Sequence, residues 1–210
     1  MSKLQDVVNA VVSGKSKLVA GLVQEALDEG CSAPDILNGM INAMGIVGER
    51  FKKNEIFVPE MLVAARAMKK GVDVLKPHLA SGSAGVCGKA IIGTVAGDLH
   101  DIGKNLVAMM IESAGFEVID LGVDVPVEKF IETVKANPDV KIVGCSALLT
   151  TTMPALKSTV EALNAEDFRS HIKVMVGGAP ITQEFANEIG ADAYTPDAAS
   201  AAQKAKELVA

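Results

Sequence analysis

The sequence of 210 residues carries 20 Lys and Arg against 26 Asp and Glu, and hydrophobic residues make up 49% of it. A chain of this size and composition can bury a substantial core in one large domain or two small ones. The net charge of −6 and the aromatic share of 3% argue against nucleic-acid binding, which needs basic and stacking side chains. No apolar run approaches the roughly 18 residues of a membrane-spanning helix, so we expect neither nucleic acid nor membrane as a partner.

The first part of the chain has the pattern of amphipathic helices, because apolar side chains recur at spacings of three and four residues. They do so in four segments, 4–12, 18–27, 34–51 and 59–75. Gly14 and Gly30 follow the first two segments, and Pro34 suits the first turn of the third. Since only short turns separate the segments, we expect a four-helix bundle over residues 1–80.

A short stretch of small residues follows the helical part. Ser81–Gly85 reads SGSAG, a composition typical of flexible connections. We expect a linker over residues 81–88 that lets the parts on either side move.

The remaining residues, 89–210, alternate between short apolar runs and helical segments. The runs that we expect to form strands are 90–95, 117–121, 141–145, 172–176 and 193–194. Five strands with helical crossovers predict an α/β fold with a doubly wound parallel sheet. In the flavodoxin-like strand order 2-1-3-4-5, ligands bind at the carboxyl ends of strands 1 and 3.

The end of the first of these strands carries the residues with the clearest chemistry. Asp98, His100 and Gly103 form the pattern D-x-H-x-x-G directly after the strand. A neutral imidazole is a good ligand for a transition metal, and a carboxylate on its other nitrogen fixes the tautomer. The local sequence leaves an alternative open, in which Asp98 is a capping residue beside a solvated histidine. A zinc site formed with Cys145 lacks the further clustered ligands that zinc needs.

Two other strand ends complete a recognisable combination. Ser146-Ala147-Leu148 follows the third strand after a gap of 42 residues from Gly103, and Gly177-Gly178 follows the fourth after a gap of 28 more. The combination resembles the cobalamin-binding module of methionine synthase and the corrinoid proteins of methyltransferase systems, which serve methylamines, methanol, betaine or O-demethylation. The resemblance covers nearly the whole chain, and it makes the helical bundle a cap on the α/β domain.

The resemblance implies a cobalamin or related corrinoid, with His100 as the lower axial ligand of cobalt. Ser146 and Thr150 are then expected to hydrogen-bond the buried tail of the corrinoid, and Leu148 to pack near the lower face of the ring. Thr152 stands where methionine synthase has a serine that extends the Asp–His pair. Gly93, Gly177 and Gly178 are expected to leave room for the tail. The expected cofactor-binding residues of the α/β domain are Gly97, Asp98, His100, Asp101, Ile102, Gly103, Ser146, Leu148, Thr150, Thr152, Gly177 and Gly178.

The resemblance extends to the helical part. Gly48–Phe51 and Phe57–Glu60 resemble the stretch of methionine synthase that covers the upper corrin face. Phe51 and Val58 are therefore expected to shield a methyl group on cobalt, although methionine synthase has a leucine where this chain has Val58.

The implied function is that of a methyl carrier with no catalytic residues of its own. Such a protein accepts a methyl group on Co(I) from a substrate-specific methyltransferase and donates it from methyl-Co(III) to a second methyltransferase, with tetrahydrofolate or coenzyme M as acceptor. A reductive activase is the expected third partner. The alternatives are the small cobalamin-binding subunit of an adenosylcobalamin-dependent mutase and a cobalamin-based sensor.

The cellular location is expected from two features of the sequence. Cys31, Cys87 and Cys145 are odd in number and lack C-x-x-C spacing, which favours reduced thiols. The charged residues among the first six do not fit a signal peptide. We therefore expect a cytoplasmic protein.

Overall fold

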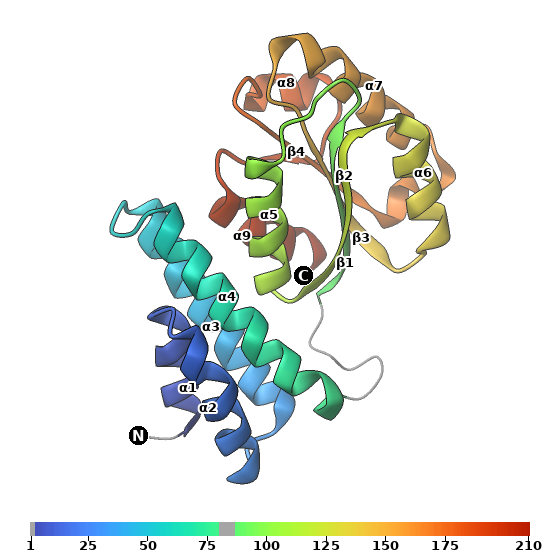
Figure 1. The fold of residues 1–210 in the computed structure, drawn as a ribbon. Coiled ribbons are helices and arrows are strands. Elements are labelled where there is room, and N and C mark those ends of the chain that lie inside the picture. Colours follow the sequence, from blue (N-terminus) through green and yellow to red (C-terminus); the bar gives the residue numbers. More distant parts are fainter. Residues whose placement is uncertain (1–2, 80–86) are drawn as a thin grey trace. The chain divides into compact units, whose positions relative to one another are not determined.

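The structure is a computed structural model that describes residues 3–79 and 87–210. The chain divides into two compact units, Met1–Val86 with Ser113–Gly115, and Cys87–Glu112 with Phe116–Ala210. Figure 1 shows the helical unit in blue to blue-green and the α/β unit in green to red. Most of the expected linker, 81–88, lies outside the described residues, and its last residue, Gly88, already begins a strand.

The helical unit contains the four expected helices. They are α1 (Lys3–Val12), α2 (Ser16–Asp28), α3 (Ala33–Lys52) and α4 (Val58–Leu75), followed by a 3-10 turn, η1 (Lys76–His78). Helices α1 and α4 both pack against α2 and α3, so the four surround one core. Fully buried side chains such as Met40, Met61 and Met68 fill this core. The expectation of a four-helix bundle is confirmed.

Local hydrogen bonds fix where two of these helices begin. The Ser32 hydroxyl accepts a hydrogen bond from the Asp35 N–H at 3.2 Å, which caps α3. The Phe57 N–H donates to the Glu60 carboxylate at 3.0 Å, which caps α4. Asn54, with φ +56, forms the tight turn between them.

The α/β unit contains a five-stranded parallel sheet in the order β2-β1-β3-β4-β5. Its strands are β1 (Gly88–Val95), β2 (Phe116–Val125), β3 (Val140–Ser146), β4 (Lys173–Gly177) and β5 (Ala193–Tyr194). The connecting helices are α5 (Ile102–Ser113), α6 (Val127–Ala136), α7 (Met153–Asn164), α8 (Gln183–Glu188) and α9 (Ala198–Val209), with 3-10 turns η2 (Thr150–Thr152) and η3 (Asp167–His171). The predicted fold class and strand order are confirmed.

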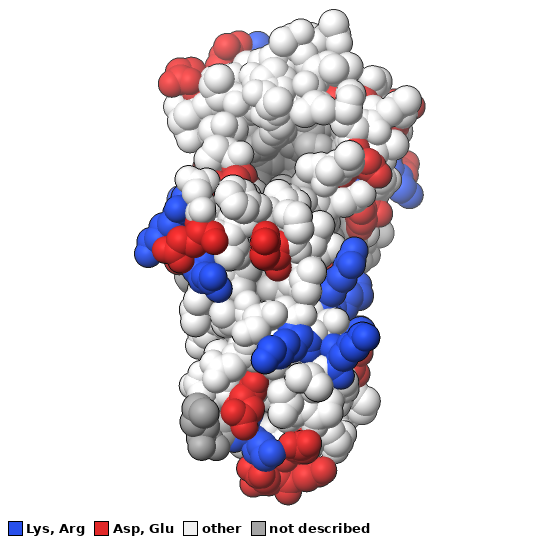
Figure 2. All heavy atoms as spheres, turned by 60° about the vertical axis from the view of Figure 1, so that its left-hand side comes forward, with Lys and Arg blue, Asp and Glu red and all other residues white. Residues whose placement is uncertain are grey.

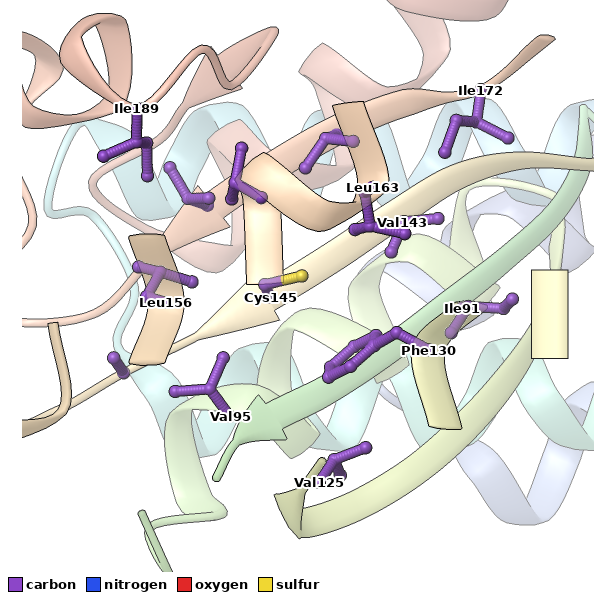
Figure 3. Packing of buried hydrophobic residues seen from close by; sticks show 14 of the residues in the cluster. Ile91, Val95, Val125, Phe130, Val143, Cys145, Leu156, Leu163, Ile172 and Ile189 are labelled. Carbon is purple, nitrogen blue, oxygen red and sulfur yellow. The ribbon is translucent and has the colours of Figure 1, made fainter. Parts of the chain in front are cut away.

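The helices cover both faces of this sheet. Helices α6, α7 and α8 share a buried cluster with the sheet, whereas α5 and α9 lie on the opposite face (Figure 1). Figure 3 shows the cluster, with Phe130 of α6 beside β1 and Leu156 and Leu163 of α7 beside β3. Because both faces are covered, the inner strands β1, β3 and β4 are mainly apolar and buried rather than alternating.

The position of Phe130 explains why strand β1 has a glycine, Gly93, in its interior. A Cβ at Gly93 would lie 2.8 Å from the Phe130 ring, so this ring occupies the space that a side chain would need. The expectation that Gly93 leaves room for a ligand is therefore wrong, and the glycine serves packing between β1 and α6.

Strand β2 is longer than its sequence suggests. We expected it to end at Leu121, but it continues to Val125 through two shifts of register against β1. Gly122, with φ +85, allows the chain to bulge and then resume pairing. The extension brings Asp124 level with the end of β1.

The surface agrees with the mixed charge of the sequence. Figure 2 shows Lys and Arg side chains interspersed with Asp and Glu over the visible face. Within residues 3–79 and 87–210, no helix is both long enough and apolar enough to cross a membrane.

Candidate functional site

The candidate site lies at the carboxyl edge of the sheet, where β1 and β3 end side by side. Thr94 of β1 is paired in register with Ser146 of β3, and α5 leaves β1 on one face while α7 leaves β3 on the other. This is the point where the order of the strands reverses, and crevices at such points bind ligands in doubly wound sheets. The segment from Gly97 to Asp101 connects β1 to α5 at this place.

Asp98 is the buried centre of the site. One of its carboxylate oxygens, Oδ1, accepts a hydrogen bond from the His100 N–H at 3.1 Å and lies 2.7 Å from His100 Nδ1. The other, Oδ2, accepts from the Leu148 N–H at 2.7 Å and from the Thr152 hydroxyl at 2.8 Å. Both oxygens therefore face two donors each, and this set joins the loops after β1 and β3.

The hydrogen-bond donors around Asp98 also determine the charge of its carboxyl group. Burial alone would raise the pKa of Asp98, because it disfavours a charged carboxylate. The hydrogen bonds from Leu148, His100 and Thr152 outweigh burial and hold the pKa of Asp98 well below its usual value. Asp98 is thus an acceptor-only carboxylate at neutral pH.

His100 presents its ring to solvent from this support, with 49% of the side chain exposed. A carboxylate beside Nδ1 favours the tautomer that carries the hydrogen on that nitrogen. Nε2 then keeps its lone pair and is the ring nitrogen available to a metal.

Thr152 extends the pair as its position in the sequence predicted. Its hydroxyl lies 2.8 Å from Asp98 Oδ2 and 2.9 Å from the Leu149 carbonyl oxygen. Because a hydroxyl has one hydrogen, it donates to one of these oxygens at a time. The ionised carboxylate is the stronger acceptor.

Thr94 is a buried residue of the site that sequence reasoning missed. Its hydroxyl donates to the His100 carbonyl oxygen at 2.9 Å and lies 2.9 Å from the Ser146 hydroxyl. With the hydrogen of Thr94 directed to the carbonyl, Ser146 is the donor between the two hydroxyls. The available signal was a polar residue next to the end of a fully buried strand.

The double glycine after β4 supports the loop after β3. The Ala147 N–H donates to the Gly177 carbonyl oxygen at 3.2 Å. At Gly178, φ is +133, and a Cβ would lie 1.8 Å from the Ala147 carbonyl oxygen. Glycine is therefore required by the approach of the protein's own backbone, whereas at Gly177 the nearest atom, the Thr195 carbonyl oxygen, lies at an ordinary 3.6 Å.

Apolar side chains stand exposed around His100. Leu99 is 72% and Ile102 84% exposed, and Leu148 and Leu149 on the loop after β3 are exposed as well. Exposed apolar side chains gathered near a polar centre are typical of ligand sites. The other expected residues, Gly97, Asp101, Gly103 and Thr150, are also exposed here, and the Asp101 carboxylate accepts from the Asn105 amide at 3.1 Å.

Phe51 and Val58 belong to the helical unit. Phe51 is half-buried near the end of α3, and Val58 is exposed at the first position of α4. Phe57, which we had not singled out, is more exposed than either, at 62%. The structure describes the two units separately, so a role of these residues near His100 stays a prediction.

The side chains at the site fit a metal ion that takes one ligand from the protein and its other ligands from a cofactor. Within the described residues, no group of three or more His, Cys, Asp or Glu side chains could hold a metal ion, which argues against a zinc site. One imidazole, oriented by a carboxylate and surrounded by exposed Leu and Ile, suits an ion that is already bound in a flat apolar ring. A corrinoid meets this description.

Comparison with known proteins agrees with this chemistry. Two family models, both described as B12 binding domain, match residues 3–76 and 88–204. The chain is 46% identical over 209 residues to the dimethylamine corrinoid protein of Methanosarcina barkeri, which covers 99% of this chain and 97% of that protein. Both parts of the chain are therefore matched.

Two solved structures are also similar. One is a cobalamin-binding protein from Desulfitobacterium hafniense DCB-2, with a TM-score of 0.83, 33% identity and coverage of 99% of this chain and 98% of that one. The other is a chain of the methanol:cobalamin methyltransferase complex of Methanosarcina barkeri, with a TM-score of 0.85, 28% identity and coverage of 99% and 79%.

Proposed function

The chain belongs to the family of B12 binding domains, and from this premise we propose how it carries methyl groups between methyltransferases. It binds cobalamin or a related corrinoid, as its relatives do by name, and it acts as the methyl carrier of a methyltransferase system. The observation that carries the assignment of the site is the contact of 2.7 Å between Asp98 and Nδ1 of a solvent-exposed His100.

Nε2 of His100 would be the protein's ligand to the cobalt of a bound corrinoid. Asp98 holds the tautomer and the orientation of the ring, and Thr152 donates to Asp98. Leu99, Ile102 and Leu148 offer apolar surface to the lower face of the ring. The hydroxyls of Ser146 and Thr150 are the polar groups for the tail, and Gly97, Asp101, Gly103, Gly177 and Gly178 shape the loops around it.

When bound, the corrinoid supplies the methyl-transfer chemistry, since its cobalt takes up and gives up the methyl group. The residues of this chain bind and tune it. Asp98, which accepts from the Thr152 hydroxyl, would hold the proton on Nδ1 of His100, so that Nε2 would keep its lone pair for cobalt. Phe51 and Val58 of the helical unit are our candidates for shielding the upper face.

The partners follow from the relatives. One relative is named for dimethylamine, and a similar structure is part of a methanol:cobalamin methyltransferase complex. We propose a substrate-specific methyltransferase as donor, with methylamines as the first substrate class to test, and a second methyltransferase that passes the methyl group to tetrahydrofolate or coenzyme M. A reductive activase completes the proposed set, and the cytoplasm is the proposed location.

The match over both units favours the carrier over the alternatives. A mutase subunit should combine the α/β unit with a substrate barrel, and a sensor needs an output module. The alignments with these relatives cover 97% or more of both chains, so they take in both units of this chain.

The axial position of His100 is tested with protein in which all histidines carry nitrogen-15. The chain has three histidines, and His78 and His171 are exposed and supply matched controls. The protein is loaded with hydroxocobalamin and reduced to Co(II), and its electron paramagnetic resonance spectrum is recorded. We expect nitrogen-15 splitting that is lost only in His100→Ala. Nitrogen-15 splitting that persists in His100→Ala would contradict the assignment.

The carrier function is tested by methyl transfer. The loaded protein is reduced to Co(I) and mixed with dimethylamine and a dimethylamine methyltransferase, and methylation is followed in the visible absorption spectrum. We expect methylation that depends on both additions. A protein that binds hydroxocobalamin through His100 but is methylated by none of the methylamine, methanol, betaine or aryl-ether methyltransferases would contradict the carrier function.

A further inference from the structure

Asp124 has a backbone conformation that side chains rarely adopt. Its φ is +52, and Asn54 is the other non-glycine residue with positive φ in the described parts of the chain. Asp and Asn tolerate this conformation better than most residues, but it still disfavours the folded state. Such residues persist where their surroundings hold them, and they gather at functional sites.

Two hydrogen bonds hold Asp124 against the loop that precedes His100. Its carboxylate oxygen Oδ1 accepts from the Gly97 N–H at 2.7 Å, and its own N–H donates to the Asp98 carbonyl oxygen at 2.9 Å. Gly97 itself has φ +80. The backbone on both sides of the peptide bond between Gly97 and Asp98 is thus fixed by one residue of the neighbouring strand.

A second carboxylate of β2 holds the far side of the same segment. Asp120 lies 2.6 Å from Lys104 Nζ through each of its oxygens, and the Lys104 side chain is only 2% exposed. Lys104 belongs to the first turn of α5. The segment from Gly97 to Lys104, with His100 in its middle, is therefore anchored to β2 at both ends.

The end of β2 lies beside the loop that carries His100. Two register shifts against β1 carry β2 past Gly122, and Val125 then pairs with Val95, the last residue of β1. Asp124 therefore lies beside the point where the chain leaves β1, within reach of the Gly97 N–H.

We propose that Asp124 is a positioning residue that presents His100 to cobalt by fixing the Gly97–Asp98 backbone. The inference rests on the proposed role of His100 as axial ligand. Asp124 acts through the loop: holding Asp98 in place holds the carboxylate that orients the imidazole.

The test compares three variants of the full chain. Asp124→Gly keeps the positive φ and the backbone N–H, and removes only the carboxylate. Asp124→Asn keeps both the conformation and an acceptor oxygen. Glu117→Gln removes one negative charge from the other end of β2, where the carboxylate is exposed and lies 3.9 Å from Lys89 Nζ.

The readout is the ratio of histidine-coordinated to histidine-free cobalt after loading with hydroxocobalamin and reduction to Co(II). We expect Asp124→Gly to bind the corrinoid with this ratio reduced about five-fold, the effect of losing one hydrogen bond. Asp124→Asn and Glu117→Gln should stay within about two-fold of the unmodified protein.

Three outcomes would overturn the proposal. The first is a ratio in Asp124→Gly equal to that of Glu117→Gln. The second is a fall in Asp124→Asn as large as in Asp124→Gly, which would make the charge responsible rather than the hydrogen bond. The third is an Asp124→Gly protein that no longer folds, which would make Asp124 a residue of general stability.

A measurement without corrinoid separates this inference from the proposed function. If the unmodified protein shows no histidine coordination, the proposed function fails, and nuclear magnetic resonance of the apoprotein then decides on the positioning. We expect the Gly97 amide to lose protection from hydrogen exchange and the His100 ring signals to shift in Asp124→Gly alone. Ring signals identical to those of the unmodified protein would overturn the positioning role.

Discussion

At the scale of the residue, the site depends on one carboxylate that only accepts hydrogen bonds. Asp98 faces backbone N–H groups of His100 and Leu148, the His100 ring and the Thr152 hydroxyl. A neutral acid or an amide would place a donor against one of these donors. The negative charge of Asp98 is therefore part of the fold as well as of the ligand geometry.

Replacing Asp98 with Asn should destabilise the apoprotein by about 2–3 kcal/mol, because one amide NH₂ then meets buried donors. Asp101→Asn, three residues along in the exposed part of the loop, should change the free energy of unfolding by less than about 0.5 kcal/mol. Urea unfolding at pH 7 measures both. Equal effects of the two substitutions would show that the buried hydrogen bonds of Asp98 do not stabilise the apoprotein.

Cys145 gives the molecule a pH dependence on the alkaline side. Burial raises the pKa of its thiol to about 12, against 9.0 for an exposed thiol. The unfolded chain therefore releases this proton at lower pH than the folded protein. The contribution of the Cys145 thiol to the free energy of unfolding is complete below pH 9. It is lost as the pH rises towards 12, by at most about 1.4 kcal/mol per pH unit.

The measurement is the difference in free energy of unfolding between the unmodified protein and Cys145→Ala from pH 8 to 10.5. We expect this difference to shrink as the pH rises. A constant difference for Cys145→Ala would mean that its thiol titrates normally.

The residues of the site were predictable to different degrees. Asp98 and His100 were found because the spacing of a short motif after a strand carries the signal, and Thr152 was found through the resemblance to methionine synthase. The structure brings these three together. Thr94 and Asp124 were missed, since their roles arise from the pairing of strands that are distant in sequence. The prediction for Gly93 was wrong because a glycine in a strand indicates that another group lies close to the backbone. The sequence does not show whether that group is a ligand or, as here, the Phe130 ring.

At the scale of the element, the loops after β1, β3 and β4 support one another in order. Gly177 and Gly178 hold Ala147, the next residue Leu148 donates to Asp98, and Asp98 orients His100. The strands that carry these loops were placed correctly from their apolar runs. The length of β2 was not, because Gly122 resembles a strand end until the register against β1 is known.

Gly178→Ala tests this support from the far side of the site. The added Cβ would lie 1.8 Å from the Ala147 carbonyl oxygen in a backbone conformation that Ala disfavours. We expect a loss of about 3 kcal/mol or more of stability in the α/β unit. Differential scanning calorimetry of the apoprotein measures it.

Gly21 of α2 provides the matched control for that substitution. It lies inside a helix, and nothing stands within 4 Å of the place of its Cβ. Gly21→Ala should therefore stabilise the helical unit by about 0.5–1 kcal/mol. A Gly178→Ala protein as stable as Gly21→Ala would contradict the close approach of Ala147.

At the scale of the whole molecule, each unit has a core of its own. The cluster around Phe130, Leu156 and Leu163 is drawn entirely from the α/β unit, and the four helices enclose another. The α/β unit also supplies the hydrogen-bond partners of Asp98 and His100 that the structure describes. The sequence indicated this division through the change from helical to alternating patterns near residue 88.

A fragment of residues 87–210 should therefore fold alone and bind hydroxocobalamin. Circular dichroism should show a cooperative thermal transition, and equilibrium dialysis should show binding that weakens in the His100→Ala fragment. A fragment of residues 3–79 should fold as a helical bundle without binding. An 87–210 fragment that stays unfolded would contradict the independence of the α/β unit.

The shape of β2 has a consequence for the protein before any cofactor is bound. A long strand at the edge of a sheet is a template on which another chain can add a strand and begin to aggregate. In β2 the bulges interrupt the regular ladder, and Glu117, Asp120 and Asp124 place negative charges along it. We therefore expect these features of β2 to reduce aggregation of the newly synthesised apoprotein.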